Sequence, residues 1–331
     1  MTGKGATRPG TLAALAAAGV VLGAVATSSN PVFVRLSDVP ETASAFHRMA
    51  WALPAFAVWG LVAGLGARRA GAGEGSRAPV VAQSRRPRRP TRSIGIPTER
   101  RDLLLLVLCG AFFAGDLAAL HAAVNLTTAA NAILFLNAQP IYVSIGAWLL
   151  FGERIGVRFA GAAVLALFGA AVLTWTSLDF GAGHALGDFL GVVAGVCYAG
   201  YILAASRLRT DYSSLAINVA TCLVGAPLLL AAALAAGQPI TPPSVNDWFL
   251  MIGLGVLAHA CGQGLIVWGL AHLPAAFASV SLLVAPVSAA VFAWLLLAEP
   301  LGPLQVAGMA LVLAGVQLAW RAHSAENSPE R

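Results

Sequence analysis

The sequence predicts an all-α integral membrane protein with ten transmembrane helices arranged as two inverted five-helix repeats. Three observations predict this fold: long apolar runs, an uneven distribution of Lys and Arg, and an internal repeat. Of the 331 residues, 58% are hydrophobic and only 10% are charged, whereas a soluble domain carries about 25% charged residues. Barrel strands alternate polar and apolar residues and these runs do not, so a helix bundle is expected.

The apolar runs are each about 20 residues long, which is the length of a helix that crosses a bilayer. We predict spans at residues 11–29, 41–65, 103–124, 127–151, 158–177, 187–206, 213–236, 248–271, 275–298 and 303–321. Residues 1–29 also resemble a cleavable signal peptide. We interpret them as the first span, because removing them would break the five-plus-five pattern.

Lys and Arg predict the orientation, because cytoplasmic loops are enriched in these residues. If the N-terminus lies inside, all of the 20 basic residues except Arg35 and Arg48 fall on the cytoplasmic side. Arg35 then lies in an outside loop and Arg48 within a span. We therefore expect both termini to be cytoplasmic and the membrane to be the plasma (inner) membrane. The net charge of +6 is a topology signal, and no nucleic-acid partner is expected.

Half of the 20 basic residues lie in one segment, residues 66–101, which contains the run 85–90 of four Arg and two Pro. This composition cannot bury enough apolar surface to fold, so the segment is predicted to be a disordered loop. Two interpretations stay open. The loop binds anionic lipid headgroups, or it is a solvated loop that only fixes the orientation.

An internal repeat becomes visible when the fourth and fifth spans are aligned without gaps on the ninth and tenth. The matched pairs are Pro140 with Pro286, Trp148 with Trp294, Glu153 with Glu299, Gly156 with Gly302, and Gly169 with Gly315. Five spans are an odd number, so the second copy must be inverted in the membrane. We predict a first repeat at 1–178, a second at 179–322 and a cytoplasmic tail at 323–331. Inverted repeats are a recurring plan of secondary transporters, with the substrate site between the halves.

Two segments also carry a resemblance to a known family. They run from 126 through Pro140 to Arg154, and from 273 through Pro286 to Pro300. They resemble the EamA-type repeats of the drug/metabolite transporter superfamily. The resemblance implies a transporter of amino acids, other metabolites or drugs. The chain departs from the family pattern in the length of the 66–101 loop and in Ala298, where a glycine is usual.

Ionisable side chains inside spans are candidates for a binding site, because a charge in the membrane is costly unless it faces a cavity or a partner. Asp116 and Arg48 both lie about 12 Å from the outer face, at about 1.5 Å per helical residue. We expect them to lie within reach of each other, directly or through a water or a substrate. A substrate- or proton-binding site and a structural ion pair are both open interpretations.

Amides and a histidine give further candidates for substrate binding or proton coupling. His259 and Gln263 are four residues apart, so they would share one face of an α-helix. Asn131, Asn137 and Gln139 precede Pro140, which can kink the helix and expose backbone carbonyls. For each group, packing between helices is the alternative. Pro140, Pro286, Glu153 and Glu299 are interpreted as structural landmarks of the repeats, the acids because a helix N-terminus favours negative charge.

The expected function is secondary transport, most simply export of small organic metabolites by alternating access. No Gly-rich phosphate-binding loop is present, so ATP is not expected to drive transport, and a proton gradient stays open. The alternative is a membrane-embedded enzyme that acts on a lipid or a lipid-linked substrate. The sequence has no metalloprotease or nucleophile-elbow motif, and its six His are scattered. We expect no enzyme activity, no metal and no cofactor. The expected partners are a small-molecule substrate and the lipid bilayer, and the oligomeric state stays open.

Overall fold

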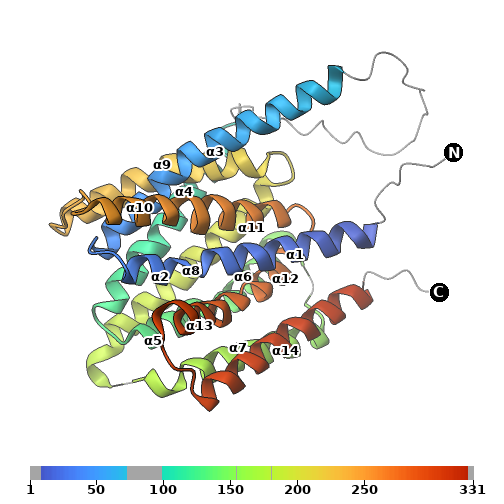
Figure 1. Cartoon of the computed structure of the whole chain (residues 1–331). Coiled ribbons are helices and arrows are strands. Elements are labelled where there is room, and N and C mark those ends of the chain that lie inside the picture. The colour runs from blue at the N-terminus through green and yellow to red at the C-terminus, as the bar shows by residue number, and fades with distance from the viewer. Residues whose placement is uncertain (1–8, 73–98, 154, 180, 327–331) are drawn as a thin grey trace.

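The computed structural model describes residues 9–72, 99–153, 155–179 and 181–326, and within these ranges the chain forms helices and turns without a strand (Figure 1). The α-helices are α1 (Pro9–Thr27), α2 (Asn30–Arg35), α3 (Glu41–Ala72), α4 (Arg100–Val124), α5 (Ala129–Asn137), α6 (Gln139–Phe151), α7 (Val157–Thr174), α8 (Ala185–Leu208), α9 (Ser214–Ala235), α10 (Val245–Gly253), α11 (Gly264–Gly269), α12 (Ala275–Ser281), α13 (Val284–Leu297) and α14 (Pro303–Glu326). Two 3-10 turns, η1 (Trp175–Ser177) and η2 (Ala182–His184), flank the 179–181 connection, and a π-helix, η3 (Leu254–Gln263), joins α10 to α11.

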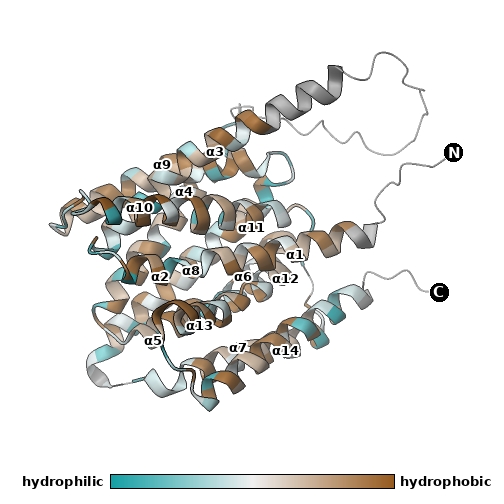
Figure 2. Ribbon diagram, in the orientation of Figure 1, coloured by the Kyte–Doolittle hydropathy of each residue, from teal (hydrophilic) through white to brown (hydrophobic). Residues whose placement is uncertain are grey.

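These helices form membrane spans. In the described part of the chain, nine helical segments are long and apolar enough to cross a bilayer, and the 32-residue α3 packs among them. Figure 2 shows brown, hydrophobic residues along the helices. Large apolar side chains such as Trp148, Leu149, Trp294 and Leu295 are more than half exposed. Exposed apolar area on this scale needs a lipid environment. The prediction of an all-α integral membrane protein is confirmed.

Three of the spans are interrupted within their length. The break between α1 and α2 falls at Ser28 and Ser29, and the break between α5 and α6 at Ala138, just before Pro140. The break between α12 and α13 falls at residues 282–283, just before Pro286. Proline has no N–H to continue the helical ladder but fits the first turn of a new helix, so both prolines stand at the start of a second segment.

The α6–α7 and α13–α14 turns have the same local geometry. Gly152 (φ 69°) and Ala298 (φ 54°) both adopt the left-handed conformation after the helix ends. The next N–H, that of Glu153 or Glu299, then donates over 3.3 Å to the carbonyl of Ala147 or Ala293 respectively. Each bond closes a helix C-cap whose C′ residue is left-handed. The two segments that the sequence aligns therefore end their helices in the same way.

Several pairs of helices pack against each other, some of them through glycines. α7 lies along α14 over much of its length, α4 along α8 and α9, and α3 along α9 and η3. Figure 1 shows α7 and α14 side by side at the lower edge of the bundle. Close approach of membrane helices through glycine is typical, because lipid tails provide no hydrophobic drive between helices.

Three boundaries differ from the sequence prediction. The first span continues through α2, so Arg35 is the last residue of a helix and not part of a loop. α3 continues to Ala72 and α4 starts at Arg100, so the ends of the predicted 66–101 loop are helical, while 73–98 lie outside the described residues. Lys4, Arg8 and Arg154, used for the orientation, also lie outside the described residues.

Candidate substrate cavity

A cavity of about 230 Å³ lies in the centre of the bundle, where the three broken spans meet. It is bounded by the α1–α2 break, α3, α4, the α5–α6 break, α8, the end of η3 and the α12–α13 break. Its lining includes five of the seven side chains that the sequence proposed for binding or coupling, namely Arg48, Asp116, Asn137, Gln139 and Gln263. The other two, Asn131 and His259, lie elsewhere.

Arg48 is presented to the cavity by α3. Its side chain is buried, with 4% of the residue exposed, and its guanidinium carbon lies 5.5 Å from the centre of the Phe113 ring. The aromatic face attracts the cation, so Phe113 fixes the position of the charge. The Nε atom of Arg48 has no hydrogen-bond partner among the residues that the structure describes.

Asp116 comes from α4, three residues after Phe113 and therefore on the same face of that helix. The residue is also 4% exposed, and its Oδ1 atom has no hydrogen-bond partner within the described ranges. The two charges attract each other, yet they form no ion pair within 4.0 Å in the described part of the chain. The direct contact that the sequence left open is therefore not made. Both side chains face one cavity instead.

The amides at the α5–α6 break reach the cavity from the opposite side. Asn137 ends α5 and Gln139 begins α6, so the interruption at Ala138 places both side chains at the wall. Asn137 Nδ2 and Gln139 Oε1 are buried and have no partner in the described structure, which leaves one donor and one acceptor. A buried polar atom without a partner is destabilising by about 1–3 kcal/mol, and such atoms are frequent at functional sites.

Only Gln263 of the predicted pair His259 and Gln263 lines the cavity. Gln263 accepts from the Tyr201 hydroxyl over 3.5 Å, whereas His259 Nε2 lies 3.3 Å from Cys222 Sγ, behind the wall. Both residues belong to the π-helix, whose i→i+5 hydrogen bonds wind the chain more loosely than an α-helix. The His259 ring meets Phe113 edge-on, with centroids 5.1 Å apart.

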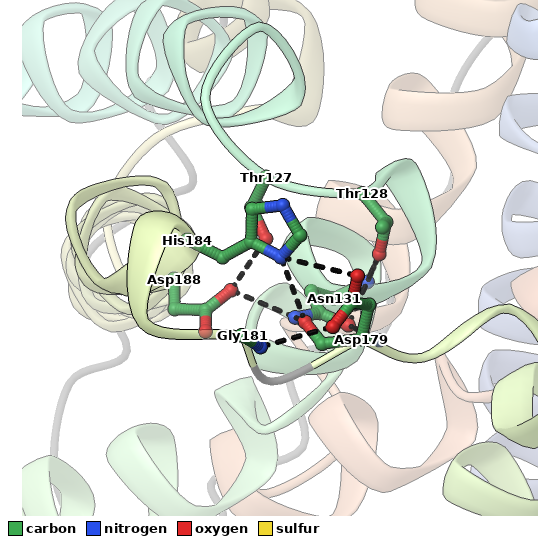
Figure 3. A network of polar contacts seen from close by, with 7 residues as sticks. All are labelled: Thr127, Thr128, Asn131, Asp179, Gly181, His184 and Asp188. Atoms are coloured by element: carbon green, nitrogen blue, oxygen red, sulfur yellow. Dashed lines mark hydrogen bonds and ion pairs between the residues drawn. The ribbon is translucent and has the colours of Figure 1, made fainter.

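Asn131 belongs to a polar network at the outer end of α5, shown in Figure 3. Its Nδ2 donates to the Asp179 carbonyl over 2.5 Å and to Asp188 Oδ1 over 3.0 Å, and its Oδ1 accepts from the Asp179 N–H over 3.0 Å. Thr128 caps α5 by accepting from the Asn131 N–H. The amide is completely used in joining α5 to the start of α8, so we assign it a structural position and not a place at the cavity.

Several lining residues were not predicted. Thr27, Ser28 and Asn30 reach the cavity from the α1–α2 break, and Tyr198 and His121 reach it from α8 and α4. The first three could have been found, because the polar run 27–30 followed by Pro31 interrupts an otherwise apolar span. His121, near the end of α4, is half-buried at the wall.

The two landmark acids lie at opposite turns, away from the cavity. Glu153 receives the N–H groups of Ala275 and Ala276 at the start of α12. Burial raises the pKa of Glu153 above its usual value, and these two donors oppose the rise. Glu299 forms an exposed ion pair with Arg35 at the end of α2. Each acid therefore connects its own turn to an element of the other half of the sequence.

Comparison with known proteins identifies the family. The sequence matches the EamA-like transporter family over residues 78–175 and 185–321, which is well over half of the chain. The chain belongs to the EamA-like transporter family. The matched residues start after α3, so Arg48 lies outside them while Asp116, Asn137 and Gln263 lie within.

Curated EamA-like relatives are transporters by name. An "Uncharacterized transporter" of Archaeoglobus fulgidus is 31% identical over 202 residues, which cover 60% of this chain and 70% of the relative. A "Probable terminal-alkyne amino-acid exporter" of Streptantibioticus cattleyicolor is 30% identical over 228 residues, which cover 66% of this chain and 73% of the relative. A protein crystal structure has the same fold with a TM-score of 0.73, over 95% of this chain and 99% of the other, at 16% identity.

The family and the fold together establish a multi-pass membrane transporter. They favour transport over the membrane-enzyme alternative. Within the described residues, no group of three or more His, Cys, Asp or Glu side chains is placed to hold a metal ion.

Proposed function

We propose that this EamA-like protein is a secondary transporter that exports small organic metabolites across the plasma membrane by alternating access. One observation carries the proposal: buried polar atoms without protein partners surround a cavity at the point where three spans are broken. Broken helices near the middle of the membrane form the substrate sites of many secondary transporters. Irregular backbone at that depth is tolerated where it lines a cavity.

The packing of the bundle supports an inverted repeat. The five spans of one half can be matched in order to the five spans of the other half. The contact of α4 with α8 then corresponds to the contact of η3 and α11 with α1, and both contacts are extensive. The contact of α4 with α9 has its counterpart between η3 and α3, and that of α6 with α8 between α13 and α1. Two related halves of this kind can rock against each other around a fixed site.

The cavity is asymmetric along the membrane normal, which supports alternating access. Its lining lies between mid-depth and the end of the bundle that holds α2 and the start of α5. At the other end all seven residues of α12 are buried, and α12 packs against α6 and α1. The structure thus corresponds to a state closed at the α12 end. Opening that end requires α12 to separate from α6.

The orientation proposed from the charges agrees with the positions of the helix ends. The start of α1, the end of α3 and the end of α14 lie at the same end of the bundle, on the right in Figure 1. We propose that this end is cytoplasmic. Coupling to protons is a further proposal for which Asp116 is the candidate carboxyl group, and a protonophore tests it in cells.

The function is tested with purified protein in liposomes that contain a metabolite mixture. Efflux of a chemically unchanged solute, measured by mass spectrometry and absent from protein-free liposomes, is the expected result. Conversion of a solute or lipid into a new compound would favour the enzyme alternative. No movement and no conversion of any component would reject the transport proposal.

A further inference from the structure

We infer that Glu153 and Glu299 hold the two ends of the cavity closed in turn, each by binding the first N–H groups of a helix in the other half of the chain. Such a contact is called a latch below, and only one latch is made at a time. The inference rests on the proposed alternating access and names the residues that stabilise each closed state. The two acids are equivalent in the repeat, since both directly follow a left-handed residue, Gly152 or Ala298, yet their partners differ.

Glu153 makes its latch in this structure, at the end that α12 closes. Its carboxylate faces the N–H groups of Ala275 and Ala276, the first two residues of α12. Both alanines are buried, and α12 packs against α6, the helix that Glu153 follows. A negative charge beside the first N–H groups of a helix is stabilising. The contact joins α6 to α12, so it is lost when α12 separates from α6.

Glu299 makes no such contact here. In the gap-free alignment of the fourth span with the ninth, the first two residues of α12 correspond to Ala129 and Ala130, which begin α5. Ala129 is exposed, and neither N–H donates to a residue outside α5 within the described ranges. Glu299 forms an exposed ion pair with Arg35 at the end of α2 instead. The latch at the α5 end is therefore open in this structure.

An exchange of the two conformations closes the α5 end. In a transporter built from inverted repeats, the halves move against each other when the open end changes, so each half can adopt the arrangement that the other has here. Glu299 then takes the position of Glu153, and its carboxylate binds the first N–H groups of α5. Glu153 releases α12 at the same time. The ion pair with Arg35 competes with the new contact only weakly, because both of its side chains are about half exposed.

The two latches have opposite effects on the equilibrium between the states. An interaction that exists in only one of two states favours that state by its own free energy. Glu153→Gln removes a charge that stabilises closure at α12, so it should favour the state closed at α5. Glu299→Gln should favour the state closed at α12. A contact that only stabilises the fold would favour neither state.

Hydrogen exchange of the full chain in nanodiscs, measured by mass spectrometry, reports on both ends in one experiment, because backbone N–H groups are protected where a segment is packed. In Glu153→Gln we expect exchange at 275–281 to become faster, and exchange at 129–137 to become slower, by at least about threefold each. A factor of this size corresponds to one contact between a charge and a helix end. Glu299→Gln should give the reverse at both ends.

Two further variants separate the latches from unrelated effects of charge. Arg35→Gln removes the partner that competes for Glu299, so it should shift exchange in the same direction as Glu153→Gln, by a smaller factor. Glu99→Gln is the matched control. Glu99 is exposed before α4 and its side chain caps no helix, so its loss should change exchange at neither end.

Faster exchange at α12 in Glu153→Gln without slower exchange at α5 would show a local cap only and would overturn the inference. The same is true if both glutamate variants shift exchange in one direction. Efflux from liposomes is measured on the same preparations. If the wild type exports a solute and the opposite shifts are absent, the latches are wrong and the transport proposal stands. If the opposite shifts appear and no solute moves, the latches stand and the transport proposal fails. Where one glutamate variant does not fold, the other still decides, because its effect must have opposite signs at the two ends.

Discussion

Gly169 of α7 and Gly308 of α14 pack so closely that a Cβ atom on either one would lie 2.9 Å from the carbonyl oxygen of the other. The same hypothetical atoms would lie 2.5 Å from the Val312 and Leu173 backbone nitrogens respectively. Backbone atoms cannot shift as a flexible side chain can. This contact therefore sets the distance between the last helices of the two predicted repeats.

Gly169→Ala and Gly308→Ala should each lower the free energy of unfolding by about 1–3 kcal/mol, because each forces the α7 and α14 backbones apart. The change is measured as a fall in the melting temperature in one detergent. Gly161→Ala is the matched control. It lies on the same helix, and a Cβ there meets nothing within 4 Å, so its melting temperature should not fall. Equal effects at Gly161 and Gly169 would contradict this account of the crossing.

The left-handed C-cap of α13 predicts an unusual stabilising substitution. Ala298 is the only non-glycine residue with positive φ in the described part of the chain, and its counterpart is Gly152. Ala298→Gly should raise the free energy of unfolding by about 0.5–1 kcal/mol, because the left-handed conformation is strained for alanine. Gly152→Ala should lower it by a similar amount. Thermal unfolding of the pair checks both signs, and a destabilised Ala298→Gly would refute the shared cap geometry.

Two amides of α5 should respond differently to alanine. Asn131→Ala should lower the amount of folded protein, since it removes hydrogen bonds to Asp179 and Asp188 that each contribute about 0.5–1.5 kcal/mol. Asn137→Ala should keep the expression level and reduce transport, because its Nδ2 bonds to no described residue. Expression and efflux are measured on the same cells. Normal levels of Asn131→Ala would show that the network in Figure 3 is dispensable.

The orientation predicts where reporter domains become active. Fusions at residues 85 and 331 should both report a cytoplasmic location, because Lys and Arg are retained on that side. A fusion after Arg35 should report the opposite side, since α1 and α2 form one span. The same location for all three fusions would contradict the proposed topology, which places one span between residues 35 and 85.

The fold class could be predicted from the sequence, because apolar runs of about 20 residues are stable as helices that cross a membrane. Matching residues such as Pro140 and Pro286 also identified the segments whose breaks and caps have the same geometry. The positions of individual polar side chains were harder to predict. Asn131 and Asn137 have the same chemistry, but six residues rotate them to different faces of α5, and only packing decides which face meets the cavity.

The π-helix is the clearest case that the sequence did not predict. Nothing in residues 254–263 distinguishes i→i+5 from i→i+4 hydrogen bonding, so an ordinary α-helical span was expected there. Tertiary packing against α1 and α3 selects the wider helix. The direct contact between Arg48 and Asp116 was also undecided from the sequence. Residue spacing predicts how deep each side chain lies in the membrane, but not how wide the cavity between them is.

The central claim is that solute crosses through the cavity, and its accessibility from each side tests this most directly. Ala285 lines the cavity at the α12–α13 break, so Ala285→Cys places a thiol there with little change in volume. The four native cysteines, of which Cys261 is exposed, are first replaced by alanine. In oriented vesicles, a membrane-impermeant thiol reagent should then label the introduced cysteine from either side, and a transported solute should slow the labelling. Ala226→Cys, buried on α9 outside the lining, is the control and should stay unlabelled. Labelling from one side only, or from both sides without protection by solute, would contradict alternating access through this cavity.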